Sequence, residues 1–328
     1  MPVPIKTGTV LRNRYQVEKI IGQGGMGSIY LAGDLRLEGR LCAVKEVEYD
    51  RALPEEMLTE ARNQFQREAT ILARLDHPNL PKVSDFFSIE ARDYLVMDYV
   101  PGKDLRQLMM EARQQGTFIP EEKVLDWASQ LASALNYLHH QEHPILHRDI
   151  KPSNLKLTPN GLVKLVDFGL VKLLAPGEIT ITVLQGQGTA LYTPLEQYGG
   201  DSGHTDARSD IYAFAGTLYH LLTNEPPLNV RDRFLNPGSL TRIREINPSV
   251  SVRTEKAVHW ALQLHPEDRP ENIEAFIKAL FVEDAPVTKP YHRDRTPLKT
   301  IGSPERLLLF LAGGMVLVSL LLTLLRNF

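Results

Sequence analysis

Apolar and polar residues follow two different patterns in the first part of the chain. The stretches 14–21 (RYQVEKII), 27–34 (GSIYLAGD) and 40–49 (RLCAVKEVEY) are rich in β-branched and aromatic residues, which is typical of strands. Residues 63–75 (NQFQREATILARL) instead repeat apolar side chains at helical spacing. The pattern therefore predicts successive strands followed by a helix.

The carboxyl-terminal part of the chain has a different pattern. Residues 307–325 form a run of 19 residues without a charge, and a helix of that length covers ~28 Å, close to the ~30 Å hydrocarbon layer of a membrane. The alternative is a buried helix of the last domain, but such a helix normally shows a polar face. Residues 283–306 carry four prolines and mixed charge, which is typical of a linker. We expect a juxtamembrane linker followed by a transmembrane helix.

The composition is that of a globular protein. Of the 328 residues, 43% are hydrophobic and 23% are charged, and the formal net charge of −3 disfavours binding of nucleic acid through charge alone. The single cysteine, Cys42, excludes an internal disulfide and a cysteine-rich zinc site, and it fits a reducing compartment. The amino terminus has no apolar core long enough for a secretory signal. We therefore expect the bulk of the chain to be cytoplasmic.

Glycines are concentrated between the first two expected strands. Gly22, Gly24 and Gly27 have the spacing G-x-G-x-x-G, which lets backbone N–H groups approach a polyphosphate with no Cβ in the way. This motif alone is weak, and its dinucleotide-binding version requires a helix after the loop. Here another strand follows, so we expect a hairpin and no dinucleotide site.

One lysine lies within an otherwise apolar strand. Lys45 follows Ala43 and Val44, and Glu68 lies between apolar positions of the expected helix. A lysine pointing to solvent is the common arrangement. The alternative is a buried pair of Lys45 and Glu68 that holds a phosphate-binding cation in place.

Three later motifs decide between these alternatives. They are HRDIKPSN at 147–154, DFG at 167–169 and GTALYTPLEQ at 188–197. In this order, after the glycine loop and Lys45, they resemble the protein kinase family, and most closely the bacterial serine/threonine kinases with a G-x-G-G-M-G loop. The resemblance covers about residues 12–282.

The resemblance implies a role for each motif residue in phosphoryl transfer. Lys45 would hold the α- and β-phosphates of ATP, and Glu68 would orient Lys45. Asp149 would accept or orient the proton of the substrate hydroxyl. Lys151 would neutralise the moving phosphoryl group and is typical of serine/threonine kinases. The expected Mg²⁺ ligands are Asp167, with Asn154 on a second ion.

The nucleotide would lie beneath the glycine loop and against the hinge between two lobes. Met97 would guard the rear pocket, backbone groups of Asp98 and Val100 would bind adenine, and Asp104 would meet the ribose. Ile29 and Ala43 would form the ceiling of the site. The full set of nucleotide contacts that the resemblance implies is Ile21, Gly22, Gly24, Gly25, Gly27, Ile29, Ala43, Lys45, Met97, Asp98, Val100, Asp104 and Lys156.

Other matched residues have implied structural roles. Glu196 is expected to pair with Arg269 and to fix a substrate platform. Asp210 is expected to accept hydrogen bonds from the backbone of the catalytic loop. His147 is expected to pack against Phe168. We expect the remaining histidines, His139 among them, to be ordinary surface or packing residues.

The chain departs from the family pattern at several positions. Lys156 replaces the leucine or methionine expected under adenine, and its methylene stem would cover the ring. Tyr212 replaces a common tryptophan. Ser153 stands where some basophilic kinases have an acid, so an arginine-directed substrate preference is not indicated.

The resemblance implies an α+β, two-lobed kinase fold. The amino-terminal lobe (12–97) would have a small antiparallel sheet and one long helix near residues 55–75, a hinge (98–100) would follow, and the carboxyl-terminal lobe (101–282) would be mainly helical. The expected activity is transfer of the γ-phosphoryl of ATP, with Mg²⁺, to serine or threonine of protein substrates. A pseudokinase scaffold and a small-molecule kinase are the alternatives.

The resemblance also implies how the activity is regulated. Arg148 precedes the catalytic aspartate, so phosphorylation of Thr180 or Thr182 is expected to order an activation loop, whereas Thr189 is assigned to the substrate platform. Self-association for trans-autophosphorylation stays open.

Residues 283–306 would be the linker and 307–325 a single-pass carboxyl-terminal anchor. The kinase domain would be cytoplasmic, since five cations precede the anchor and only Arg326 follows it.

Overall fold

The computed structural model describes residues 4–24, 27–49, 54–90, 92–167, 190–198 and 205–282. Its strands are β1 (Val10–Leu11), β2 (Tyr15–Gly24), β3 (Gly27–Asp34), β4 (Leu41–Glu48), β5 (Val83–Ile89), β6 (Arg92–Asp98), β7 (Lys103–Asp104), β8 (Leu155–Leu157) and β9 (Val163–Leu165). Its α-helices are α1 (Glu55–Leu72), α2 (Leu105–Gln114), α3 (Glu121–His139), α4 (Ala207–Thr223), α5 (Val230–Leu235), α6 (Ile243–Ile246), α7 (Val252–Ala261) and α8 (Ile273–Phe281). Short 3₁₀ turns are η1 (Pro152–Asn154), η2 (Leu195–Gln197) and η3 (Pro266–Asp268).

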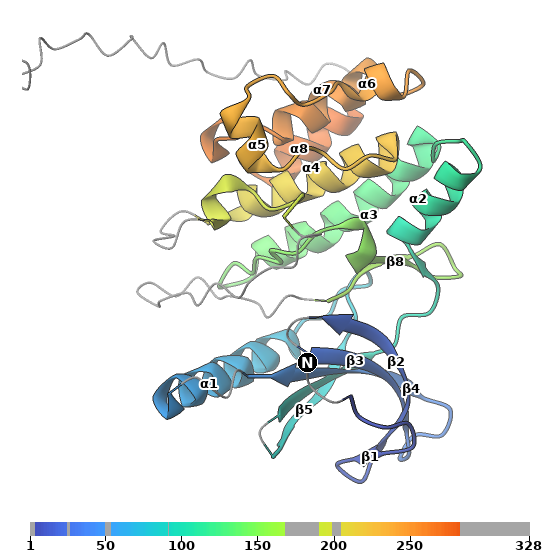
Figure 1. Ribbon diagram of the computed structural model, residues 1–328, viewed down its shortest axis with the longest axis vertical. Helices are drawn as coiled ribbons and strands as arrows, with labels where there is room; N and C mark the ends of the chain where they lie inside the picture. Colours follow the sequence, from blue (N-terminus) through green and yellow to red (C-terminus); the bar gives the residue numbers. More distant parts are fainter. Residues whose placement is uncertain are drawn as a thin grey trace, which may run out of the picture. The chain divides into compact units, whose positions relative to one another are not determined.

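The amino-terminal lobe is an antiparallel sheet with one helix beside it (Figure 1). Among the described residues the sheet has six strands in the order β1-β2-β3-β4-β6-β5. The expected hairpin at the glycine loop is confirmed, because β2 pairs with β3 up to Gly24 and Gly27. The additional strand β1 begins before residue 12 and pairs with β2.

The helix α1 has one apolar face that packs on the sheet. Its buried residues are Phe65, Glu68, Ala69 and Leu72, which follow the i, i+3, i+4, i+7 spacing of a single face. Glu55 and Glu56 in the first turn stabilise the positive end of the helix dipole. The helix ends at Leu72, three residues before the expected end.

The two faces of the sheet bury different sets of residues. Cross-strand partners share a face, and the register pairs Ile29 with Lys45 and Ala43 with Met97. That face belongs to the main core, which also holds the buried side of α1. The opposite face has a core of its own, which sequence analysis did not predict; its members are Leu11, Tyr15, Val17, Tyr30, Ala32, Cys42, Val44, Phe87, Tyr94 and Val96.

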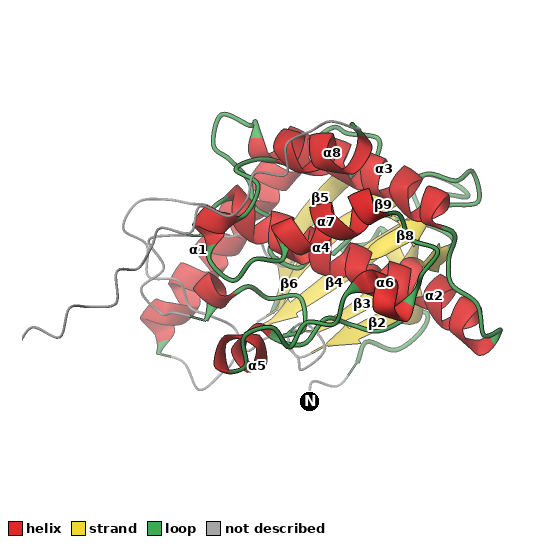
Figure 2. Cartoon of the chain, turned by 90° about the horizontal axis from the view of Figure 1, so that it is seen from above, coloured by secondary structure: helices red, strands yellow, loops and turns green. Residues whose placement is uncertain are grey.

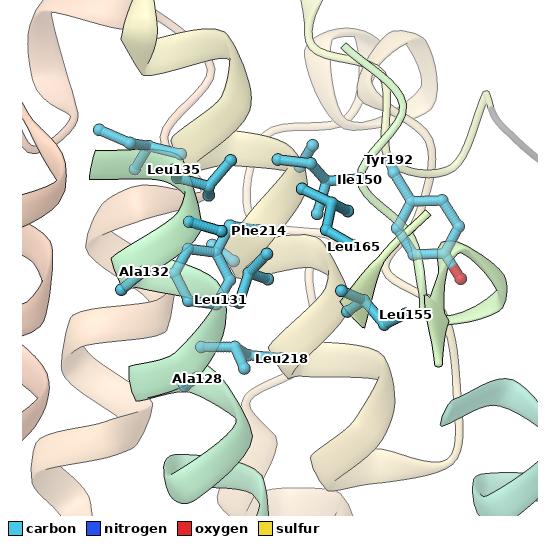
Figure 3. Packing of buried hydrophobic residues seen from close by; sticks show 14 of the residues in the cluster. Ala128, Leu131, Ala132, Leu135, Ile150, Leu155, Leu165, Tyr192, Phe214 and Leu218 are labelled. Atoms are coloured by element: carbon cyan, nitrogen blue, oxygen red, sulfur yellow. The ribbon is translucent and has the colours of Figure 1, made fainter. Parts of the chain in front are cut away.

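The carboxyl-terminal lobe is built around α3 and α4, as expected for a mainly helical lobe. Figure 3 shows apolar side chains of α3 meeting Phe214 and Leu218 of α4. From Ser209 to Thr223 almost every residue of α4 is buried, so this helix is enclosed by its neighbours. Seen from above in Figure 2, α3, α7 and α8 lie near it, and contacts of α4 with each of them agree.

A small sheet of β7, β8 and β9 follows the hinge and the catalytic loop. It joins the start of α2 to the turn η1, because β7 pairs with β8 and β8 with β9. Gly102, just before β7, has a φ of +105°, and a Cβ there would lie 2.0 Å from the carbonyl oxygen of Leu157. A glycine is therefore required where the hinge meets this sheet.

The described residues include no helix that is both long and apolar enough to cross a membrane. The linker 283–306 and the expected transmembrane segment 307–325 lie outside the described residues.

Candidate active site

The loop between α3 and β8 brings three predicted site residues together. The Lys151 ammonium group donates a hydrogen bond of 2.8 Å to Oδ2 of Asp149. The amide nitrogen of Asn154 donates to the same Oδ2 at 3.0 Å and to the Asp149 carbonyl at 2.8 Å. The turn η1, begun by Pro152, holds Asn154 in place. The predicted base, the predicted cation and one predicted metal ligand thus form a single hydrogen-bonded group.

The second carboxylate oxygen of Asp149 is buried and lies outside this hydrogen-bonded group. Oδ1 of Asp149 has no hydrogen-bond partner among the described residues. An unsatisfied buried carboxylate oxygen is costly, and it marks a position at which a hydroxyl donor would be stabilised. This is the arrangement that an acceptor of a substrate proton requires.

The second predicted metal ligand comes from the end of β9. Asp167 pairs with the ammonium group of Lys45 on β4, so the two lobes supply one residue each. Burial acts to raise the pKa of Asp167, but the charge and hydrogen bond of Lys45, together with the charge of Lys151, hold that pKa below its usual range. Asp167 is therefore an anion, suited to bind a hard cation.

Glu68 lies on the buried face of α1, with an exposed fraction of 2%. Its Oε1 accepts a hydrogen bond of 3.0 Å from Gln64, one turn earlier. The predicted orientation of Lys45 by Glu68 stays a prediction. Glu68 also acts electrostatically on the buried guanidinium of Arg148.

The backbone of the catalytic loop is held by one buried carboxylate, as predicted. Asp210 near the start of α4 accepts hydrogen bonds from the backbone N–H groups of His147, at 2.9 Å, and Arg148, at 2.8 Å. Arg148 has a φ of +62° and Asp167 one of +59°. Such strained backbone persists only where the surrounding contacts enforce it, and it occurs often at functional sites.

The structure corrects the role expected for His139. It is not an ordinary packing residue, because its Nε2 lies 2.9 Å from Oδ2 of Asp210 and its side chain is only 7% exposed. The end of α3 is thereby tied to the catalytic loop through one carboxylate. No motif or spacing in the sequence pairs this histidine with Asp210, so the sequence analysis missed it.

The substrate platform is anchored by the predicted ion pair. Arg269 donates to both carboxylate oxygens of Glu196, at 2.7 and 3.1 Å, and its side chain is fully buried. It also donates to the carbonyls of Arg208, Gln263 and Leu264. Tyr212, which replaces the common tryptophan, lies with its ring 4.8 Å from the guanidinium carbon.

The expected adenine pocket lies on the core-facing side of the sheet. Met97 is 7% exposed and Ala43 8% exposed, and the two are cross-strand partners. Ile29, on the same side, packs against the core cluster. The backbone N–H of Val100 donates to no backbone carbonyl among the described residues, whereas that of Asp98 donates to Lys82. The hinge therefore retains a donor at Val100.

Two other expected nucleotide contacts lie where β7 meets β8. Asp104 and Lys156 are cross-strand partners. Asp104 is the N-cap of α2, and its Oδ1 accepts from the backbone N–H of Gln107 at 2.8 Å. A ribose contact would therefore share this carboxylate with the cap. The roles of Asp104 and Lys156 toward nucleotide stay predictions.

The glycine loop is described except at its tip. Gly22 pairs with Ile29. Gly27 has a φ of +139°, and a Cβ there would lie 2.1 Å from the carbonyl oxygen of Glu46, so only glycine fits. Ile21 is exposed. The expected residues Gly25, Phe168, Thr180, Thr182 and Thr189 lie outside the described residues.

The sequence analysis missed a polar network behind the hinge. The guanidinium of Arg14 donates to both oxygens of Asp34, at 2.9 and 2.7 Å, and that carboxylate is fully buried. Arg40, in the turn between β3 and β4, lies 3.5 Å from Asp34 and donates to Asp98 at 3.2 Å. The side chain of Asp98 is thus tied to the sheet. No motif or spacing singles out Arg14, Asp34 or Arg40.

Comparison with known proteins identifies the family. Residues 15–286 match the protein kinase domain. The chain belongs to the protein kinase family. As a member of this family, it has the expected two lobes, with a curled antiparallel sheet and a helical lobe.

Individual relatives agree with the family assignment. The chain is 35% identical over 272 residues to serine/threonine-protein kinase PknB of Mycobacterium leprae, covering 79% of this chain and 41% of PknB. It is 33% identical over 285 residues to a probable serine/threonine-protein kinase of Clostridium acetobutylicum, covering 83% of this chain and 40% of that protein. The chain thus spans about two fifths of these relatives' length.

Solved structures show the same fold. The apo form of PpkA-294 is 28% identical, with a TM-score of 0.68, and the match covers 84% of this chain and 99% of that one. The PknI kinase domain of Mycobacterium tuberculosis is also 28% identical, with a TM-score of 0.64 and coverage of 84% and 98%.

Protein kinases in general use ATP and Mg²⁺. The residues of this chain fit that requirement. Asp167 supplies an ionised carboxylate, and the amide oxygen of Asn154 is a hard donor whose amide nitrogen is already bonded to Asp149. The described residues contain no group of three or more His, Cys, Asp or Glu side chains arranged for a metal.

Proposed function

We propose that this kinase transfers the γ-phosphoryl group of ATP to serine or threonine hydroxyls of proteins. The observation that carries the proposal is the unsatisfied Oδ1 of Asp149 beside Lys151 and Asn154. The relatives' names support the choice of serine and threonine, as does Lys151, which is typical of that class.

The residues of the catalytic loop account for the chemistry. The acceptor hydroxyl donates its proton to Asp149, its oxygen forms a new bond to the γ-phosphorus, and the bond from that phosphorus to the β-bridging oxygen breaks. ADP leaves with the electron pair of the broken bond. Lys151 stabilises the negative charge on the transferred group, since its ammonium lies 2.8 Å from Asp149.

Lys45, Asp167 and Asn154 would hold the triphosphate and its metal. Lys45 would bind phosphate oxygens, and Asp167 and Asn154 would bind Mg²⁺, which neutralises the phosphate charge when bound. The pair of Lys45 and Asp167 orients both residues before nucleotide arrives. Such preorganisation lowers the reorganisation needed for transfer.

A protein substrate is favoured over a small molecule by the platform at 190–198. Its anchor, the buried pair of Glu196 and Arg269, ties this segment to Ser209 and to the backbone of Arg208. The next residue, Asp210, holds the backbone of the catalytic loop. A small-molecule acceptor would not need this platform. Self-association that allows one copy to phosphorylate another belongs to the same proposal.

Incubation of the full chain with γ-labelled ATP, Mg²⁺ and a generic protein substrate tests this function. Label on serine or threonine of the protein is the expected result. Label only on small acceptors would favour a small-molecule kinase. Nucleotide binding without any transfer, in wild-type chain, would favour a pseudokinase scaffold.

We also propose that residues 307–325 anchor the kinase in a membrane, with the catalytic domain cytoplasmic. The support is the uncharged run of 19 residues and the excess of Lys and Arg before it. Carbonate extraction of membranes should leave the full chain in the pellet. Release into the supernatant, or loss of the kinase domain to protease added outside intact cells, would contradict this topology.

A further inference from the structure

The helix α2 presents two exposed arginines beside the substrate platform. Arg106 and Arg113 are seven residues apart, so they lie on one face of the helix, with Met110 between them. All three side chains are exposed, Met110 at 46%. Leu105 and Met109 form the buried face. We refer to Arg106, Met110 and Arg113 as the α2 stripe.

The positive charge of the α2 stripe is not neutralised within the described part of the chain. Glu111 is the one acid in the sequence of α2, and it accepts hydrogen bonds of 2.6 and 2.8 Å from Lys103. Arg106 and Arg113 make no ion pair with any described residue. Asp104 is engaged in capping the helix.

The charges of the α2 stripe act on Tyr192 of the platform and on its partner His220. The Tyr192 hydroxyl and Nδ1 of His220 share a hydrogen bond of 2.6 Å, and their rings stack. Figure 3 shows Tyr192 at the edge of the α3–α4 core. The charged neighbour that acts on Tyr192 is Arg106, and those that act on His220 are Arg106 and Arg113. Within the described part of the chain, no acid acts on either ring.

The same helix also touches the catalytic loop. Contacts of α2 with η1 place it next to the turn that carries Asn154, and contacts with α4 place it next to the helix that ends near His220. A peptide that lies on the platform with its hydroxyl at Asp149 therefore passes α2. Side chains of that peptide would meet the guanidinium groups of Arg106 and Arg113, which form no ion pair with any described residue.

We propose that the α2 stripe selects acidic substrates: peptides with glutamate, aspartate or an already phosphorylated side chain near the accepting serine or threonine. Guanidinium groups recognise carboxylate and phosphate through paired hydrogen bonds. Met110 adds apolar contact between the two charges. This inference rests on the proposed protein kinase activity and names its substrate class.

Peptides test the proposal on the full chain. A threonine peptide is prepared with glutamate, alanine or lysine at each of several positions on both sides of the acceptor. At one or more positions, glutamate should raise kcat/KM about fivefold over lysine, the size expected from two exposed ion pairs. This difference should shrink at high salt. Equal kcat/KM for all three residues at every position would overturn the proposal.

Two variants assign the preference to the α2 stripe. Arg106→Gln with Arg113→Gln should remove it, and Arg106→Glu with Arg113→Glu should reverse it in favour of lysine. The control is Lys256→Glu on the exposed side of α7, which changes the charge by the same amount as the double glutamine variant and should keep the glutamate preference. An unchanged preference in both double variants would also overturn the proposal.

Binding separates this inference from the proposed activity. Fluorescence anisotropy of the same labelled peptides, with Mg²⁺ and a nonhydrolysable ATP analogue, measures the preference without turnover. Tighter binding of glutamate peptides by a chain that transfers no phosphate would support the α2 stripe while contradicting the kinase function. Phosphate transfer with no preference for glutamate peptides would support the kinase function and contradict the role proposed for the α2 stripe.

Discussion

The ammonium group of Lys45 on β4 is hydrogen-bonded to a carboxylate oxygen of Asp167, which lies 122 residues later in the chain. In the structure each residue is the counter-ion of the other. When nucleotide and metal bind, Lys45 would contact phosphate oxygens and Asp167 would bind the metal. The pair therefore links β4 of the sheet to the segment that follows β9 in the helical lobe.

Removing either partner should abolish phosphoryl transfer and leave the fold intact. Lys45→Ala removes a phosphate contact, and Asp167→Asn removes a metal ligand, so a loss of about 10²–10³-fold or more in kcat is expected. Thermal unfolding of each purified variant checks the fold. Near-normal turnover of either variant would contradict the assigned roles.

The buried pair of Glu196 and Arg269 should be needed for stability as well as for the platform. Arg269→Lys keeps the charge but loses the forked donors that reach Glu196 and three backbone carbonyls. We expect a loss of about 3–5 kcal/mol in the free energy of unfolding, measured by urea denaturation. Arg208→Lys, which changes a partly exposed arginine nearby, is the control and should cost less than about 1 kcal/mol.

His220 should make the kinase less stable in acid. Burial, followed by the charges of Arg106 and Arg113, lowers the pKa of His220 to about 4. The unfolded chain, with a histidine pKa near 6.5, then binds the proton more readily, so stability is full above pH 6.5 and falls as pH drops toward 4. This residue alone contributes about 2–3 kcal/mol to the fall between pH 7 and 4.5.

The variant His220→Gln isolates this contribution. It also loses the bond to Tyr192, but that loss is independent of pH, so only the slope of stability against pH is informative. The slope between pH 7 and 4.5 should be shallower than in wild type. The exposed His140→Gln serves as the control substitution; equal slopes in wild type and His220→Gln would refute the assignment.

Activation by phosphate is expected at Thr180 or Thr182. Burial lowers the pKa of Arg148, and Nε of Arg148 has no hydrogen-bond partner among the described residues. A phosphothreonine carries about −1.5 to −2 charge and would satisfy this buried guanidinium. Mass spectrometry of active enzyme should find phosphate between residues 170 and 190. Fully active enzyme with no phosphate in that segment would rule the mechanism out.

Much of the site followed from local sequence because its motifs are short. Asp149, Lys151 and Asn154 lie within six residues, and a loop of that length forces them together. The pairs of Lys45 with Asp167 and Glu196 with Arg269 join distant segments. Those pairs were accessible through family resemblance alone, because spacing carries no information about contacts over 70 or more residues.

Other features had no local signal. The second core takes residues from all six strands of the sheet, so it depends on how the whole sheet pairs, and alternation alone does not say which face is covered. The hydrogen bond from Arg40 to Asp98 joins two charged residues that lie 58 positions apart in the sequence. Charged side chains are mostly exposed, so neither residue predicts the other as its partner. The capping box of Asp104 and Gln107 is different, since its spacing is local and visible in the sequence.

The most direct test of the account compares wild-type full chain with Asp149→Asn in phosphoryl transfer from Mg·ATP to a threonine peptide. The substitution keeps the shape of the side chain and removes the proton acceptor. The account predicts that kcat falls by about 10²–10⁴-fold while the KM for ATP stays within about twofold, because Asp149 acts on the acceptor hydroxyl and not on nucleotide binding. An Asp149→Asn enzyme that turns over at the wild-type rate would contradict the central claim.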